Sequence, residues 1–147
     1  MQGFPWGRFA VFCSALLVAV PLAASQPKPA AGHAKLVAQG KYLVEDLGMC
    51  GDCHSPRDEK GEFIPSRYLE GTVLDFQPMH PVPGWIPASP AIAGLPGWTT
   101  AESVRFFMTG IDKNGKPAGP PMPQYRMSRR DAEAVTAYLK SLVPERQ

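Results

Sequence analysis

Two cysteines and a histidine lie within five consecutive residues of this 147-residue chain, in the stretch CGDCH from Cys50 to His54. Such a cluster can form a disulfide, bind zinc, act as a redox dithiol or attach a haem covalently. Zinc sites usually need four ligands in two closely spaced pairs, and only the isolated His33 and His80 could add to this cluster. A thioredoxin-like dithiol would follow a strand within an α/β pattern, which the sequence lacks.

Covalent haem attachment requires two thiols that reach the two vinyl groups, followed at once by an imidazole for the iron. The signature of this arrangement is Cys-x-x-Cys-His, and Cys50, Cys53 and His54 match it. A buried porphyrin would also supply the apolar centre that a chain with few helices lacks. We therefore expect one haem c, bound through Cys50 and Cys53, with His54 as an iron ligand.

Three helices are expected to position this cluster. The first runs from residue 33 or 34 to residue 47, has apolar residues at helical spacing and ends at Gly48. The second follows a capping box at residues 99–102 and ends at Gly110, and the third spans about 128–142. Prolines between them exclude long helices and central strands, so the sequence predicts a mostly α fold with long proline-rich loops.

The N-terminus has the features of an exported protein. Residues 1–24 combine one arginine, an apolar run and a small-residue exit, as in a secretory signal peptide; the alternative is an uncleaved membrane anchor. We expect a flexible leader at 25–33 and one domain at 34–147. Removing Arg8 with the signal leaves fourteen of the fifteen Lys and Arg against thirteen Asp and Glu, so composition gives no support for nucleic-acid binding.

Three stretches resemble the class I cytochrome c family: GKYLVEDLGMCGDCH, GWTTAESVRFFMTGID and GPPMPQYRMSRRDAEAVTAYLKSL. More narrowly, they are similar to mono-haem domains of bacterial dehydrogenase and oxidase electron-transfer chains. The resemblance covers about residues 32–143 and implies a cytochrome c-like fold, in which the first and last helices cross at Gly40 and Tyr138. Residues 62–93 depart from the simplest members in length and proline content.

The resemblance also implies the second iron ligand, Met122, and an aromatic residue near a haem propionate, Trp98. Independently, the prolines that flank Met122 favour an extended loop at low entropic cost, and a thioether ligand raises the reduction potential. Trp98 could instead be a packing residue at the start of a helix. The other candidates for the sixth position are Met127, Met108, Met79 and His80, or an open site.

The expected function is single-electron transfer in the periplasm, or at a membrane if the N-terminus stays attached. The protein would not be an enzyme by itself, but would act with a dehydrogenase or oxidase, either free or as the cytochrome subunit of a complex. A haem-based ligand sensor and a zinc-binding structural module remain as alternatives. Basic residues around Met122 are expected to steer an acidic partner, unless they form an ordinary solvated face: Lys113, Lys116, Arg126, Arg129 and Arg130.

Overall fold

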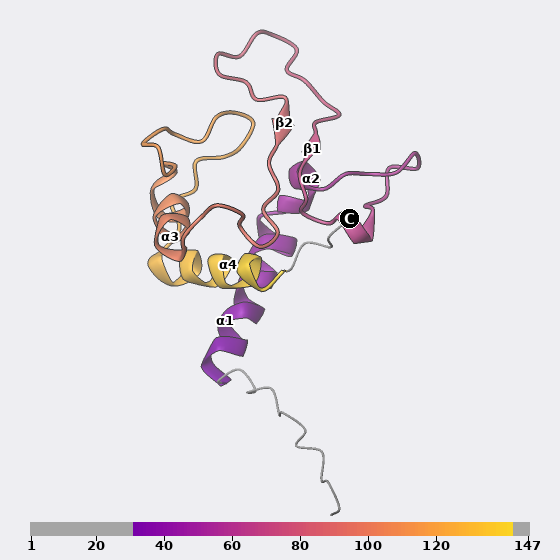
Figure 1. Cartoon of the computed structure of the whole chain (residues 1–147). Coiled ribbons are helices and arrows are strands. Elements are labelled where there is room, and N and C mark those ends of the chain that lie inside the picture. Colours follow the sequence, from indigo (N-terminus) through magenta and orange to yellow (C-terminus); the bar gives the residue numbers. More distant parts are fainter. Residues whose placement is uncertain (1–30, 143–147) are drawn as a thin grey trace, which may run out of the picture.

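The protein has a mostly helical fold, as expected, in a computed structural model that describes residues 31–142 (Figure 1). The expected signal peptide at 1–24 and the leader residues before Ala31 lie outside the described residues. The elements in chain order are α1 (Ala31–Tyr42), the π-helix η1 (Leu43–Leu47), α2 (Cys50–His54), the 3-10 helix η2 (Pro65–Arg67), β1 (Thr72–Val73), β2 (Ala88–Ser89), α3 (Thr100–Thr109) and α4 (Arg129–Ser141).

Helices α1 and α4 cross in close contact, and Figure 1 shows α4 lying across α1. A Cβ atom on the buried Gly40 would lie 1.9 Å from the carbonyl oxygen of Ala134 and 2.7 Å from Cβ of Tyr138. Glycine inside a helix costs about 1 kcal/mol relative to alanine, but here any side chain would separate the two backbones. The first and last helices therefore cross at Gly40 and Tyr138, as the family resemblance implied.

The core joins these helices to α3 and to the loop before it. Ser103 of α3 and Thr136 of α4 are buried and share a hydrogen bond of 3.0 Å between their hydroxyls, which satisfies both polar groups at the interface. The large buried apolar side chains around them are Val44, Leu69, Leu95, Val104, Phe107, Val135, Tyr138 and Leu139. A single core therefore ties the three long helices together.

The ends of α3 and α4 agree with the sequence prediction. Thr99 and Glu102 form a reciprocal capping box, and Gly110 ends α3 with a left-handed φ of 69°. The Ser128 side chain accepts a hydrogen bond from the Asp131 N–H at the start of α4. These local signals need no tertiary information, because each pairs residues a few positions apart.

The first helix differs from its prediction at both ends. Helix α1 is already formed at Ala31, where the described residues begin, before the predicted start at residue 33 or 34. At the other end the chain widens into η1, and Gly48 keeps a right-handed φ of −83°. The glycine at this position is explained by crowding, because a Cβ there would lie 2.8 Å from the Leu43 carbonyl oxygen.

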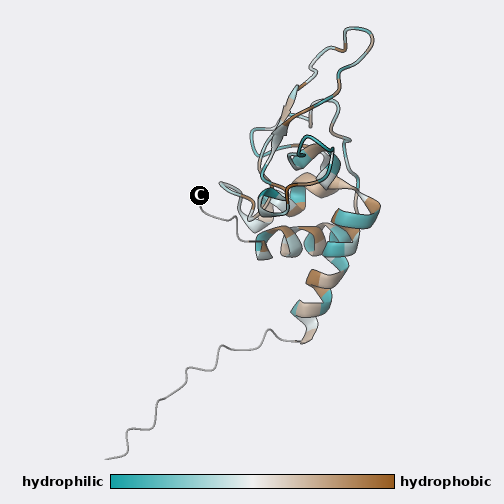
Figure 2. Cartoon of the chain, turned by 90° about the vertical axis from the view of Figure 1, so that its right-hand side faces the viewer, coloured by the Kyte–Doolittle hydropathy of each residue, from teal (hydrophilic) through white to brown (hydrophobic). Residues whose placement is uncertain are grey.

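A short antiparallel hairpin, which the sequence analysis did not predict, follows η2. Thr72 pairs with Ser89 and Val73 with Ala88, and strands of two residues are too short to display an alternating pattern. Residues 74–87 join the strands in a long loop that projects from the helical body (Figures 1 and 2). Within residues 31–142, no helix has the length and apolar character needed to cross a membrane.

The crossing predicts opposite effects for two glycine substitutions in one helix. Gly40→Ala should lower the free energy of unfolding by about 3 kcal/mol, because the new methyl group meets backbone atoms that cannot move aside. Gly32→Ala is the matched control, since a Cβ there has no neighbour within 4 Å, and stability should stay equal or rise slightly. Guanidinium unfolding would measure both; equal stability of Gly40→Ala and the parent would contradict the close crossing.

Candidate functional site

The Cys-x-x-Cys-His stretch forms α2, a single helical turn that begins after Met49, whose φ of 46° is left-handed. Both Cys50 and Cys53 are half-buried and not joined in a disulfide, while His54 is buried. Burial raises the pKa of Cys50 to about 11 and also raises that of Cys53, with further contributions from nearby acidic groups. Both thiols are therefore protonated at neutral pH, unlike the reactive thiolate of a redox dithiol.

The imidazole of His54 is held by one hydrogen bond, of 2.8 Å, between Nδ1 and the carbonyl oxygen of Pro90. A carbonyl oxygen can only accept, so Nδ1 carries the hydrogen and Nε2 keeps its lone pair. Burial lowers the pKa of His54, although the bond to Pro90 acts in the opposite direction. The ring is thus a neutral imidazole with Nε2 available, which is the form that binds metals.

The backbone around His54 is fixed by the base of the hairpin. The Gly71 N–H donates to the His54 carbonyl oxygen at 2.7 Å, and the Ser89 hydroxyl donates to the Cys53 carbonyl oxygen. Because Ser89 and Pro90 lie 36 residues after their partners, no local sequence signal indicated either contact. The hairpin therefore holds the end of α2 and the ring of His54 together.

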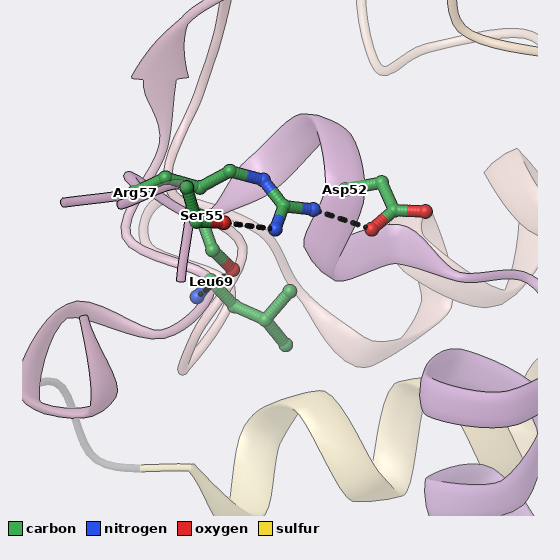
Figure 3. Close-up of polar contacts among 5 residues, drawn as sticks. Asp52, Ser55, Arg57 and Leu69 are labelled. Atoms are coloured by element: carbon green, nitrogen blue, oxygen red, sulfur yellow. Dashed lines mark hydrogen bonds and ion pairs between the residues drawn. The ribbon is translucent and has the colours of Figure 1, made fainter. Parts of the chain in front are cut away.

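Polar contacts also fold the chain back after His54 (Figure 3). The Leu69 N–H donates to the buried hydroxyl of Ser55 at 2.9 Å. Arg57 pairs with Asp52 at 2.8 Å and lies over the Phe63 ring, with 4.0 Å between the guanidinium carbon and the ring centroid. Partly exposed ion pairs contribute about 1 kcal/mol or less, so these contacts mainly determine the path of the loop.

The loop that carries Met122, residues 111–127 and called here the methionine loop, reaches the same region through Tyr125. A Cβ placed on Gly48 would lie 3.3 Å from Cys50 Sγ and 3.6 Å from the Tyr125 hydroxyl, so the two groups flank one glycine. Burial raises the pKa of Tyr125, and the neighbouring thiols of Cys50 and Cys53 raise it further. Met122 is half-buried in this loop, three residues before Tyr125, and its N–H donates to the Gly119 carbonyl oxygen at 3.1 Å.

Trp98 lies immediately before the α3 cap and is half-buried. Its ring packs against Phe106, with 5.4 Å between the centroids, and the Lys113 ammonium lies 5.6 Å from its centroid. Its carbonyl oxygen accepts a hydrogen bond from Lys140 at 2.8 Å. Trp98 therefore packs against α3 through Phe106, and the ammonium groups of Lys113 and Lys140 both lie near it.

A groove elsewhere on the molecule does not belong to this site. A groove of about 1000 Å³ lies between α1, α3 and α4, and the residues that line it do not include the α2 turn. Among residues 31–142, no three His, Cys, Asp or Glu side chains are grouped so that they could hold a metal ion.

Residues 37–143 match the family model described as cytochrome c. The chain belongs to the cytochrome c family. Over 74% of its length it is 35% identical to a subunit of nicotinate dehydrogenase from Pseudomonas putida, and over 69% it is 32% identical to a diheme cytochrome c-type protein of Cereibacter sphaeroides. Over 71% it is 27% identical to the fructose dehydrogenase cytochrome subunit of Gluconobacter japonicus. These matches cover only 9%, 34% and 21% of the relatives' own lengths.

The family therefore implies a haem c and electron transfer as the function, and the site residues fit that cofactor. Two free thiols at the required spacing precede a neutral imidazole whose Nδ1 is engaged by Pro90, while Nε2 has no hydrogen-bond partner among residues 31–142. The apolar surroundings that raise the pKa of Cys50 also suit a porphyrin. Several relatives are named as cytochrome subunits of dehydrogenases, which fits a domain of the electron-transferring cytochrome c family.

A second polar cluster, beside the site, links η1 to α4. The Tyr138 hydroxyl and the Lys41 ammonium both donate to the carboxylate of Glu45. Burial alone would raise the pKa of Glu45, but these hydrogen bonds outweigh it and leave the pKa below its ordinary value. Burial, together with Glu45, also raises the pKa of Tyr68 to about 12. The cluster thus favours a charged Glu45 at neutral pH.

This cluster predicts a pH-dependent effect of Tyr138→Phe. A group with a lowered folded-state pKa stabilises the fold above its unfolded pKa, here near 4.5, and loses that contribution as the pH falls through the folded value. The variant should be less stable than the parent by about 1 kcal/mol at pH 7, and the gap should narrow below pH 4.5. Urea unfolding from pH 3 to 7 would test this, with the exposed Tyr42→Phe as control; a pH-independent gap would contradict it.

Proposed function

We propose that this protein is a periplasmic mono-haem cytochrome c that carries single electrons to or from a dehydrogenase. The observation that carries the proposal is the His54 ring, whose bond to Pro90 leaves Nε2 available beside two free thiols. The sequence contains one Cys-x-x-Cys-His stretch, which supports a single haem. The expected signal peptide at 1–24 supports export, and the dehydrogenase relatives support such a partner.

Each residue of α2 has a defined task in this proposal. The thiols of Cys50 and Cys53 would hold the haem covalently, each through a thioether to one vinyl group. His54 would bind the iron through Nε2, with its ring held in orientation by Pro90. When bound, the haem supplies an iron that alternates between ferrous and ferric states.

Met122 is the proposed second ligand that would bind the iron. It is half-buried, and its loop is fastened at two points, by Tyr125 beside Cys50 and by a hydrogen bond of 2.8 Å from the Ile86 N–H to the Pro120 carbonyl oxygen. By contrast, the rival Met79 is 94% exposed and its neighbour His80 is also exposed. Trp98 is proposed to lie near a haem propionate, where its indole N–H could donate.

The visible spectrum of the protein exported from a host that matures haem c tests this function directly. Sharp bands on reduction, a weak red methionine-to-iron band on oxidation and no shift with carbon monoxide are expected. A prompt shift with carbon monoxide would instead support the ligand-sensing alternative. A colourless protein would refute the haem site at Cys50, Cys53 and His54.

Met122→Ala should abolish the red band and allow carbon monoxide to bind the reduced protein, because the sixth position is then open. The reduction potential should fall, since a thioether ligand raises it. Met79→Ala is the matched control and should leave the spectrum unchanged, because that side chain is 94% exposed. A red band that survives in Met122→Ala would move the sixth ligand elsewhere.

Five exposed basic residues, Lys113, Lys116, Arg126, Arg129 and Arg130, are proposed to steer an acidic partner. Arg129→Glu with Arg130→Glu should slow haem reduction by the partner about tenfold or more at low salt and much less at high salt, because steering is screened. The control is Lys35→Glu with Lys60→Glu, which makes the same charge change on other segments. Stopped-flow kinetics would measure both; equal rates in the two double variants would refute steering by these residues.

A further inference from the structure

The loop at residues 74–87, called here the hairpin tip, exposes many apolar side chains. Five large hydrophobic residues in or next to it are at least 39% exposed: Val73, Phe76, Met79, Val82 and Ile86. Between Asp75 and Glu102 the chain has no Lys, Arg, Asp or Glu. Exposed apolar surface of this kind marks an interaction site, and charge depletion with enrichment in aromatic residues and methionine is typical of the centre of a protein interface.

The hairpin tip also has a defined conformation. Phe76 and Trp85 pack edge to face across the loop, with 5.8 Å between the ring centroids. The Leu74 N–H donates to the Pro87 carbonyl oxygen at 2.9 Å, where β1 and β2 meet. Four prolines between residues 78 and 87 restrict the backbone further. A surface that is already ordered loses less entropy on binding.

The hairpin tip is joined to the methionine loop. Besides the bond from the Ile86 N–H to the Pro120 carbonyl oxygen, a Cβ on Gly119 would lie 2.6 Å from the Ile86 side chain. The basic residues Lys116 and Arg126 lie on this same loop. An exposed apolar segment therefore packs against a loop that carries basic residues, and an apolar centre with a polar border is the usual anatomy of a protein–protein interface.

We propose that the hairpin tip is the apolar centre of the surface that docks a redox partner protein, whose own site is an apolar recess bordered by carboxylates. This inference rests on the proposed electron-transfer function and adds the partner's chemistry. A lipid surface fits less well, because residues 74–87 themselves contain no Lys or Arg for anionic headgroups and include the acidic Asp75. Much of the tip backbone would also lose its water partners in hydrocarbon, whereas a protein recess can replace them.

The test compares Met79→Glu with Tyr42→Ser, a substitution of another exposed side chain that lies on a different segment. The electron donor is the membrane fraction of the organism that carries the gene, fed separately with nicotinate, fructose, gluconate and an alcohol. Met79→Glu should raise the KM for the cytochrome about tenfold at both low and high salt, because it places a charge in an apolar recess. Tyr42→Ser should behave like the parent protein, and ascorbate should reduce all three proteins equally.

Each outcome has a distinct meaning. An unchanged KM for Met79→Glu, or a loss that disappears at high salt, would overturn the apolar docking surface while the carrier function stands. Flotation of the parent, but not of Met79→Glu, with phosphatidylethanolamine–phosphatidylglycerol vesicles would replace the protein partner with a membrane. Failure of every substrate-fed membrane to reduce the parent would overturn the dehydrogenase docking. Failure of the protein to carry a haem would instead refute the proposed function.

Discussion

The close contact between α1 and α4 at Gly40 is the constraint on which the rest of the structure depends. Because position 40 has no side chain, the two backbones approach closely. The Tyr138 hydroxyl can then reach Glu45, and α4 can pack against η1. The course of α1 and η1 then determines where the α2 turn begins. A small helical protein can thus position two thiols and an imidazole accurately, because one backbone contact fixes the helix that precedes them.

The loops, which contain little regular structure, complete the site through single polar contacts. Pro90 orients the His54 ring, and Ser89 holds the end of α2, so the base of the hairpin supports the cofactor site. The tip of the same hairpin contacts Pro120 in the methionine loop. One segment therefore contacts both the α2 turn and the loop that carries Met122, and it also exposes apolar side chains, which links cofactor positioning to the proposed partner recognition.

The sequence predicted those features that depend on neighbouring residues. The Cys-x-x-Cys-His stretch, the capping box at Thr99 and the cap at Ser128 each lie within a few positions. It did not predict η1, because a π-helical turn differs from α-helix only in backbone geometry. The contacts of Pro90 and Ser89 with α2 join residues 36 positions apart. Such contacts arise from tertiary packing, which a single sequence does not specify.

The central claim is that this chain binds one haem covalently through Cys50 and Cys53. Mass spectrometry of the intact exported protein, before and after extraction with acidified acetone, tests it most directly. The account predicts a mass that exceeds the polypeptide by one haem and does not change on extraction, because thioether bonds survive the acid. The polypeptide mass alone, a haem lost on extraction, or two bound haems would contradict the account.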